Sequence, residues 1–210
     1  MSKKIKNKLK ERLTLQLPGW ATQKIMSPFK TERYLDLNKA GKKAAVLALL
    51  YPDNSDKLHL IFIKRSSNNP HDKHGGQISF PGGQQEAQDK DFEATALRET
   101  FEEVGVKSSK IEILGQLTPI YVYVSDFFVQ PFLGITHQKP EFILQASEVD
   151  HIIVESIDYL KSDASNATTD YNIRDGIMKN MPYYKVDNHI LWGATAMITA
   201  EIIQIFNEIY

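Results

Sequence analysis

Two neighbouring apolar runs constrain the fold of this chain more than any other feature. Residues 44–51 (AAVLALLY) and 58–64 (LHLIFIK) each have the length and composition of a buried strand. The Pro-Asp-Asn-Ser-Asp run at 52–56 between them is typical of a tight turn. We therefore predict a β-hairpin, and with it a sheet that other parts of the chain must cover.

The patterns that follow alternate between strands and helices. A helix is predicted over residues 92–104, with Asp91 as its N-cap and Gly105 just beyond its end. Further strands are predicted at 77–80, 111–117, 127–136 and 149–155, a closing hairpin at 183–192, and a last amphipathic helix at 194–209. Residues 161–179 are weakly patterned and are predicted to form an exposed, mobile connection. This order predicts the α/β class, with a mixed sheet between helices.

Length and composition limit the possible classes of protein. A chain of 210 residues favours one main domain, predicted at 39–210, after a basic, wrapping segment at 1–38. The formal net charge of −1 gives no indication of a nucleic-acid partner. No apolar run reaches the length of a membrane span, and the chain has no cysteine, which fits a reducing compartment. We expect a cytoplasmic protein, and the sequence leaves homodimer formation open.

The basic start of the chain admits more than one interpretation. It lacks the apolar core and cleavage site of a secretory signal, while a transit peptide or a membrane-surface helix stays open. The interpretation that we prefer is a helix that packs four apolar side chains on the domain: Ile5, Leu9, Leu13 and Leu17.

The central helix carries an unusual group of acids. On a helical wheel its predicted buried stripe consists of Ala94, Leu97, Phe101 and Val104. Glu99, Glu102 and Glu103 gather on the opposite side, at spacings where like charges repel. A hard divalent cation such as Mg²⁺ or Mn²⁺ would turn that repulsion into attraction. A solvated helix face is the alternative, and the glycines of the preceding Phe80-Pro81-Gly82-Gly83 turn weigh against it, because they allow close backbone approach to a phosphate or metal.

With this turn, the helix resembles the Nudix box. The positions that match its pattern are Gly83, Arg98, Glu99, Glu102, Glu103, Gly105 and Val106. Asp89 replaces the usual glutamate and is followed by eight residues instead of seven before Arg98, and Thr100 occupies an apolar position. The eight-residue gap after an aspartate is similar to the coenzyme A pyrophosphatase branch of the family.

A second element supports that branch. Arg65-Ser66, Gly76 and Phe80-Pro81-Gly82-Gly83 are similar to its upstream motif, and residues 190–196 are similar to its C-terminal end. The loop is about two residues longer than in the motif, and an expected arginine is Asp72, with Lys73 and His74 as the nearest basic residues.

The resemblance implies a Nudix-type α/β/α sandwich that hydrolyses a nucleoside diphosphate linked to another moiety. For coenzyme A or its acyl esters the products would be 3′,5′-ADP and (acyl-)4′-phosphopantetheine. The same chemistry on ADP-ribose, NADH or a dinucleoside polyphosphate is the alternative. A non-catalytic ligand sensor is disfavoured because all three box glutamates remain.

The resemblance also implies roles for individual residues. Mg²⁺ or Mn²⁺ would bind Glu99, Glu102, Glu103 and the Gly83 carbonyl. The predicted catalytic residues of the box are Glu99, Glu102 and Arg98, which holds a carboxylate in place. Glu148 is a candidate from outside the box, because it lies where a loop enters a strand, and it competes with Glu99 for the role of general base. The predicted contacts to a nucleotide-like small molecule are Arg65, Lys73, His74, Gly82 and Gly83.

Overall fold

The predicted hairpin is the centre of the structure. The computed structural model describes residues 3–29, 41–67, 74–173 and 176–209. Strand β1 (Lys42–Pro52) pairs antiparallel with β2 (Leu58–Arg65) through the register Leu50 to Leu60. Both strands are buried over most of their length, as their continuous apolar runs predict.

The main sheet has eight strands and is mixed. Its central path runs in the order β3-β2-β1-β7-β5, with β4 paired to β1, β6 to β7 and β8 to β2. Strand β7 (Phe127–Thr136) lies parallel to β1, and the other pairs are antiparallel. The remaining strands are β3 (Ile78–Ser79), β4 (Gly82–Gln84), β5 (Ile111–Gln116), β6 (Ile120–Val122) and β8 (Val149–Ser156).

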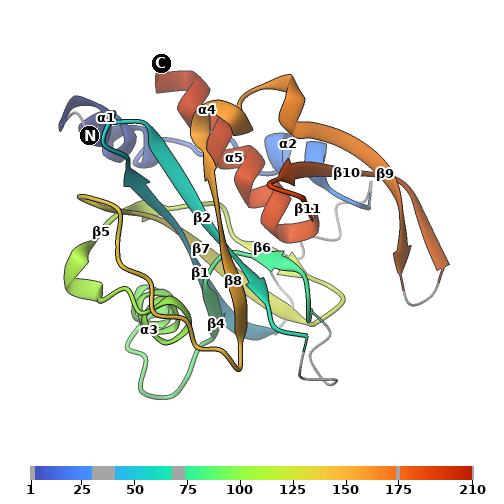
Figure 1. Ribbon diagram of the computed structural model, residues 1–210, viewed down its shortest axis with the longest axis horizontal. Coiled ribbons are helices and arrows are strands. Elements are labelled where there is room, and N and C mark those ends of the chain that lie inside the picture. Colours follow the sequence, from blue (N-terminus) through green and yellow to red (C-terminus); the bar gives the residue numbers. More distant parts are fainter. Residues whose placement is uncertain (1–2, 30–40, 68–73, 174–175, 210) are drawn as a thin grey trace.

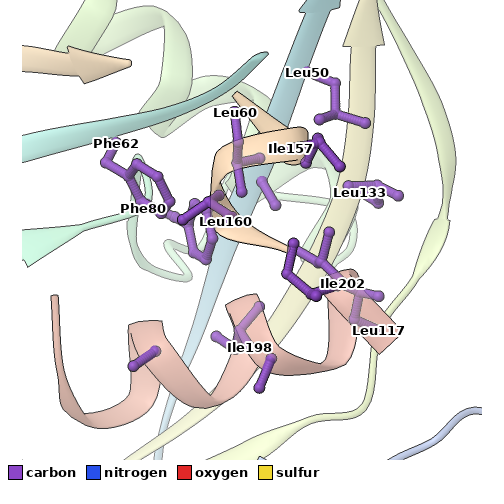
Figure 2. Packing of buried hydrophobic residues seen from close by; sticks show 14 of the residues in the cluster. Leu50, Leu60, Phe62, Phe80, Leu117, Leu133, Ile157, Leu160, Ile198 and Ile202 are labelled. Atoms are coloured by element: carbon purple, nitrogen blue, oxygen red, sulfur yellow. The ribbon is translucent and has the colours of Figure 1, made fainter. Parts of the chain in front are cut away.

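Helices cover both faces of this sheet. Helix α3 (Phe92–Val104) packs on one face and α5 (Gly193–Ile209) on the other (Figure 1). Figure 2 shows the core on the α5 side, where Phe62 and Phe80 stack with ring centroids 5.0 Å apart. A second core lies between the sheet and α3 and includes Ile63 and Val104. The α/β class with a mixed sheet between helices is therefore confirmed.

The N-terminal segment packs on the α5 side. Its helices are α1 (Lys3–Leu13), α2 (Trp20–Gln23) and the 3₁₀ turn η1 (Lys24–Met26). Leu9 is fully buried and Ile5, Leu13 and Leu17 pack against the same core, which confirms the predicted packing face. Basic side chains of α1 pair with acids of the domain, Lys6 with Glu112 at 2.8 Å and Arg12 with Glu208 at 2.5 Å. The division into residues 1–38 and 39–210 stays a prediction.

A buried carboxylate joins the N-terminal segment to α5. Glu201 is 0% exposed. It accepts hydrogen bonds from the Gly19 N–H at 3.0 Å, the Gln23 amide at 3.2 Å, and the Thr118 N–H and hydroxyl at 3.1 and 2.5 Å. Because its acceptor sites are satisfied by four donors, this buried acid links three segments that are distant in the sequence.

The predicted mobile connection at 161–179 is wrong. After α4 (Ile157–Leu160), the 3₁₀ turn η4 (Asp163–Ser165) and β9 (Asn166–Ile173), the chain enters β10 (Gly176–Val186) and then β11 (His189–Leu191). These strands form a second, three-stranded sheet in the order β11-β10-β9. Residues at the outer end of the β9–β10 pair are exposed on both faces, so the sequence there lacks the apolar alternation that indicates a strand. The predicted hairpin at 183–192 and the last helix are confirmed.

Within the described ranges, no helix has the length and apolar character needed to cross a membrane.

Candidate active site

Helix α3 begins and ends where the sequence predicts. The Asp91 side chain accepts a hydrogen bond from the Ala94 N–H at 2.8 Å, which satisfies one free donor of the first turn. Gly105 adopts a left-handed φ of 75° and its N–H bonds the Phe101 carbonyl at 2.9 Å. These caps fix the register of the helix and therefore the direction of each glutamate.

The predicted buried stripe of this helix is wrong at Phe101, although Val104 is buried and Leu97 packs against the core. Phe101 is 49% exposed, whereas Glu103 is 1% exposed and lies among the buried residues of the helix. The helix packs its small residues on the sheet instead, including Ala96 and Thr100, whose hydroxyl bonds the Ala96 carbonyl at 2.7 Å. A helical-wheel prediction based on hydrophobicity places every carboxylate on the exposed side. It takes no account of a hydrogen-bond donor on another strand that stabilises a buried Glu103.

That partner comes from the glycine strand β4. Gly82 and Gly83 pair with β1 at Val46 and Ala45, and the Gly82 N–H donates to Glu103 Oε2 at 2.8 Å. A Cβ added at Gly83 would lie 2.5 Å from Glu99 Oε1 and 2.8 Å from Glu99 Oε2. The absence of a side chain at Gly83 is therefore what lets the Glu99 carboxylate sit directly against the backbone.

Two of the three glutamates are held in an environment that opposes their charge. Burial raises the pKa of Glu103 to about 8, against the Gly82 hydrogen bond and the charge of Arg65, which lower it. Burial also raises the pKa of Glu99, and the nearby carboxylate of Glu148 contributes in both cases. A buried pair of acids with raised pKa values is characteristic of functional sites, and a cation would favour the charged forms.

Arg98 organises the rim of this group. Its guanidinium donates to both oxygens of Asp89 at 3.0 and 2.9 Å and to the Gln84 carbonyl at 3.0 Å. It also pairs with Glu102 at 2.8 Å and Glu99 at 3.0 Å. The bond from Arg98 lowers the pKa of Asp89 to about 2, although that side chain is only 4% exposed. Arg98 thus lies within 3.0 Å of three carboxylates, and its holding role stays a prediction.

Sequence reasoning did not assign a role to Asp89. It is the aspartate at the glutamate position of the box, and besides Arg98 it accepts from the Thr95 hydroxyl at 3.0 Å and the Glu86 N–H at 2.9 Å. Its place in the motif was the available signal, and the eight-residue spacing to Arg98 does not prevent the contact.

The glutamates do not form a closed set of metal ligands. Among the residues that the structure describes, no three His, Asp or Glu side chains lie close enough together to hold one ion. Glu102 has a half-exposed side chain and turns to Arg98, Glu99 shares the same guanidinium, and Glu103 turns to Gly82. Carboxylate oxygens are nevertheless the donors that Mg²⁺ and Mn²⁺ prefer, so the chemistry of the donor set fits such an ion.

The other predicted site residues differ in whether they contact the glutamates. Arg65, at the end of β2, contacts Glu103 with Nη1 3.4 Å from Oε1. Glu148 is exposed at the start of β8, where its carbonyl accepts from the Ser66 N–H at 2.7 Å. His74 contacts Gln77 at 3.2 Å, and no bond to the glutamate group is seen for it among the described residues. Lys73 lies outside the described residues.

The fold and the site now define a class. The mixed sheet between helical layers is the fold of a solved Nudix hydrolase. The NUDIX domain model matches residues 41–163, more than half of the chain. The chain belongs to the Nudix domain family.

Relatives in sequence support this assignment. The chain is similar to Nudix hydrolase NudL of Photorhabdus laumondii subsp. laumondii, at 33% identity over 140 residues, which cover 62% of this chain and 69% of that protein. It is similar to the chloroplastic Nudix hydrolase 22 of Arabidopsis thaliana, at 29% identity over 164 residues, 75% of this chain and 53% of that protein. The chain thus spans between about half and two thirds of the length of these relatives.

Solved structures agree on the fold. A Nudix hydrolase from M. smegmatis, RenU, matches with a TM-score of 0.55 and 12% identity over 80% of this chain and 88% of that one. A MutT/nudix family protein from Enterococcus faecalis matches with a TM-score of 0.50 and 17% identity over 100% of this chain and 74% of that one. Family membership supports pyrophosphohydrolase chemistry for the domain, and Nudix hydrolases generally use divalent metal ions.

Proposed function

We propose that this protein is a divalent-metal-dependent pyrophosphohydrolase that cleaves coenzyme A or acyl-coenzyme A into 3′,5′-ADP and (acyl-)4′-phosphopantetheine. One observation carries the hydrolytic part of the proposal. Glu103 is buried beside Glu99 beneath a strand of two glycines, and nothing in the packing of an ordinary helix requires an acid there. A buried carboxylate costs several kcal/mol unless a partner stabilises its charge.

The residues that would hold the cation are Glu99, Glu102 and Glu103, with Gly83 supplying a carbonyl oxygen. When bound, Mg²⁺ or Mn²⁺ supplies a Lewis acid that neutralises the diphosphate and makes water a stronger nucleophile. Glu99 and Glu102 would have to turn from Arg98 to hold the cation, because both are paired with that guanidinium. Asp89 holds Arg98 through two bonds that do not involve these glutamates.

Proton transfer from the attacking water requires a carboxylate near Glu99 and Glu103. Glu148 meets this requirement from outside the box, since its charge raises the pKa of both glutamates. Its side chain is exposed at a strand start, so it can reach a substrate without disturbing the core. We expect Glu148→Gln to lower kcat about 100-fold or more and to leave metal affinity within about threefold. An unchanged kcat would assign the base to Glu99.

Coenzyme A as the substrate rests on the upstream motif. Arg65 and Gly76 keep the positions of that motif, and the Gly76 N–H bonds the Arg65 carbonyl at 3.0 Å, so the two ends of the intervening loop meet beside Glu103. The 3′-phosphate requires basic groups near this loop. Lys73 and His74 belong to this loop in the sequence, and the phosphate is assigned to them on that ground.

A substrate panel tests the proposal. The full chain is incubated with coenzyme A, an acyl ester, dephospho-coenzyme A, ADP-ribose, NADH and diadenosine tetraphosphate, with Mg²⁺, Mn²⁺ or a chelator, and products are separated by chromatography. We expect coenzyme A or its ester to have the highest kcat/KM, dephospho-coenzyme A to be weaker, and the chelator to stop turnover. Faster turnover of ADP-ribose, NADH or the tetraphosphate would overturn the choice of substrate.

The metal assignment has its own test. Mn²⁺ binding is measured by electron paramagnetic resonance on the wild type and on Glu103→Gln. We expect the variant to bind at least about tenfold more weakly and to lose turnover, while its circular dichroism is unchanged. Glu112→Gln is the matched control, because Glu112 pairs with lysines of α1 on another side of the protein. Equal Mn²⁺ affinity in wild type and Glu103→Gln would move the metal elsewhere.

A further inference from the structure

One buried hydroxyl, in the strand just before the double glycine, is left without a hydrogen bond in the described part of the chain. Ser79 Oγ, in the short strand β3, is buried and has no hydrogen-bond partner among the described residues. Only one other side-chain atom of the described chain, His189 Nδ1, shares this condition. An unsatisfied buried polar group costs about 1–3 kcal/mol, so its presence calls for a ligand or a water that satisfies it.

The strand register places Ser79 on the face that carries the site. Ile78 and Phe80, the residues on either side of it, both belong to the core on the α5 face, and Figure 2 shows Phe80 stacked on Phe62 there. Neighbouring side chains of a strand point to opposite faces, so Ser79 points toward α3. Its direct partner on β2 is Ile63, which packs with Val104 of α3 and confirms this direction.

Two residues that contact Glu103, one on the partner strand β2 and one after β3, lie near Ser79 in the strand register. Arg65 follows Ile63 by two residues on β2 and lies on the same face, with its Nη1 3.4 Å from Glu103 Oε1. Gly82, three residues after Ser79, donates to the other oxygen of the same carboxylate at 2.8 Å. The hydroxyl thus lies in the chain segment that connects the two donors of Glu103.

We propose that Ser79 is a further substrate-binding residue, whose hydroxyl donates a hydrogen bond to a non-bridging oxygen of the bound diphosphate. This inference rests on the proposed function, because it assumes that a diphosphate occupies the space beside Glu103. Ser79 as a whole keeps part of its surface exposed, so a rotation about its Cα–Cβ bond turns the hydroxyl from its buried position toward a ligand. A hydroxyl is suited to this place because it adds a donor without adding charge next to Glu103.

The test compares Ser79→Ala with a matched control. Ser165 is fully buried, and its hydroxyl is satisfied by the carbonyls of Leu160 and Ser162 at 3.0 and 2.8 Å, away from the site. We measure the melting temperature, the KM and kcat for the best substrate of the panel, and the Kd of α,β-methylene-ADP, a diphosphate that cannot be hydrolysed at that bridge, by calorimetry in the presence of the metal.

Opposite results are expected for the two serines. Ser79→Ala should keep or raise the melting temperature, raise KM and Kd about tenfold, and change kcat less than about threefold. Ser165→Ala should lower the melting temperature and leave KM and Kd unchanged, because it removes satisfied bonds far from the substrate. A Ser79→Ala protein with wild-type KM and Kd, or with a lower melting temperature and wild-type KM, would overturn the inference. No turnover of any nucleotide by the wild type would instead refute the proposed function.

Discussion

Adding one methyl group at Gly83 should damage the site without damaging the fold. A Cβ at this position would meet three atoms of the Glu99 carboxyl group, at 2.5, 2.6 and 2.8 Å. Ordinary contacts between such atoms are about 3.5 Å, so the carboxylate must retreat by about 1 Å. Glu99 ends in a flexible side chain, and the backbone around Gly83 does not have to move. The added methyl group therefore displaces the Glu99 carboxylate, which is a proposed metal ligand, and not the backbone.

The magnitudes follow from that displacement. A shifted side-chain rotamer costs about 0.5–1.5 kcal/mol, and the smaller conformational freedom of alanine in the unfolded chain offsets about 0.4–1 kcal/mol of it. The free energy of unfolding should thus change by less than about 1 kcal/mol. A misplacement of about 1 Å in a catalytic group lowers rates about 100-fold, so kcat/KM should fall by about that factor.

The neighbouring Gly82 provides the matched control. Its φ is 154°, and an added Cβ would overlap the Ala45 carbonyl oxygen and lie 2.6 Å from the Val46 Cα. These are backbone atoms of the central strand, which cannot retreat. Gly82→Ala should therefore lower the free energy of unfolding by about 3 kcal/mol or more.

The two variants are compared by urea unfolding and by kcat/KM with saturating metal. We expect Gly83→Ala to unfold at nearly the wild-type urea concentration and to lose activity, and Gly82→Ala to unfold much earlier. The reasoning is refuted if Gly83→Ala keeps full activity at full stability, since the Glu99 carboxylate could then move without consequence.

Three further predictions concern buried or paired acids. In the presence of a chelator, the wild type should lose stability as the pH rises from about 5 to about 9, because the pKa of Glu103 is raised to about 8 in the folded state and its stabilising proton is lost; urea unfolding of Glu103→Gln should lack this loss. Asp89→Asn should lower the free energy of unfolding by about 2 kcal/mol at neutral pH, and because the pKa of Asp89 is lowered to about 2, acid titration below about pH 4 should remove this difference between wild type and variant. Glu201→Ala should lower the melting temperature by the equivalent of about 3–5 kcal/mol, since it leaves the donors of Gly19, Gln23 and Thr118 buried without an acceptor, and kcat measured well below that temperature should not change.

Much of the fold could be predicted because its signals are local. The apolar runs of β1 and β2, the Asp91 and Gly105 caps of α3, and the turn between the first two strands each depend on residues close in the sequence. Only the β10–β11 hairpin of the second sheet could be predicted in this way. Strand β9 and the first half of β10 are joined by mutual backbone hydrogen bonds, and their mostly exposed side chains leave no periodic apolar signal.

In the candidate site, too, the features that depend on neighbouring residues could be predicted and those that depend on distant strands could not. The box spacing predicts the helix and the residues that the proposal assigns to the cation, because both belong to one continuous segment. The orientation of α3 depends on a bond from another strand, Gly82 to Glu103, and the wheel therefore placed Phe101 inside and Glu103 outside. The sequence does not single out Ser79, because its significance lies in a hydroxyl that has no partner among the described residues.

The way the chain closes on itself at Arg65 has a consequence for natural variation. The Arg65 N–H bonds the Gln77 carbonyl and the Gly76 N–H bonds the Arg65 carbonyl, both at 3.0 Å, so the two ends of the intervening stretch are fixed side by side. Residues gained or lost between these ends do not alter the distance from Arg65 to the double-glycine strand. A change in the length of this stretch should therefore leave the position of Arg65 beside Glu103 unchanged.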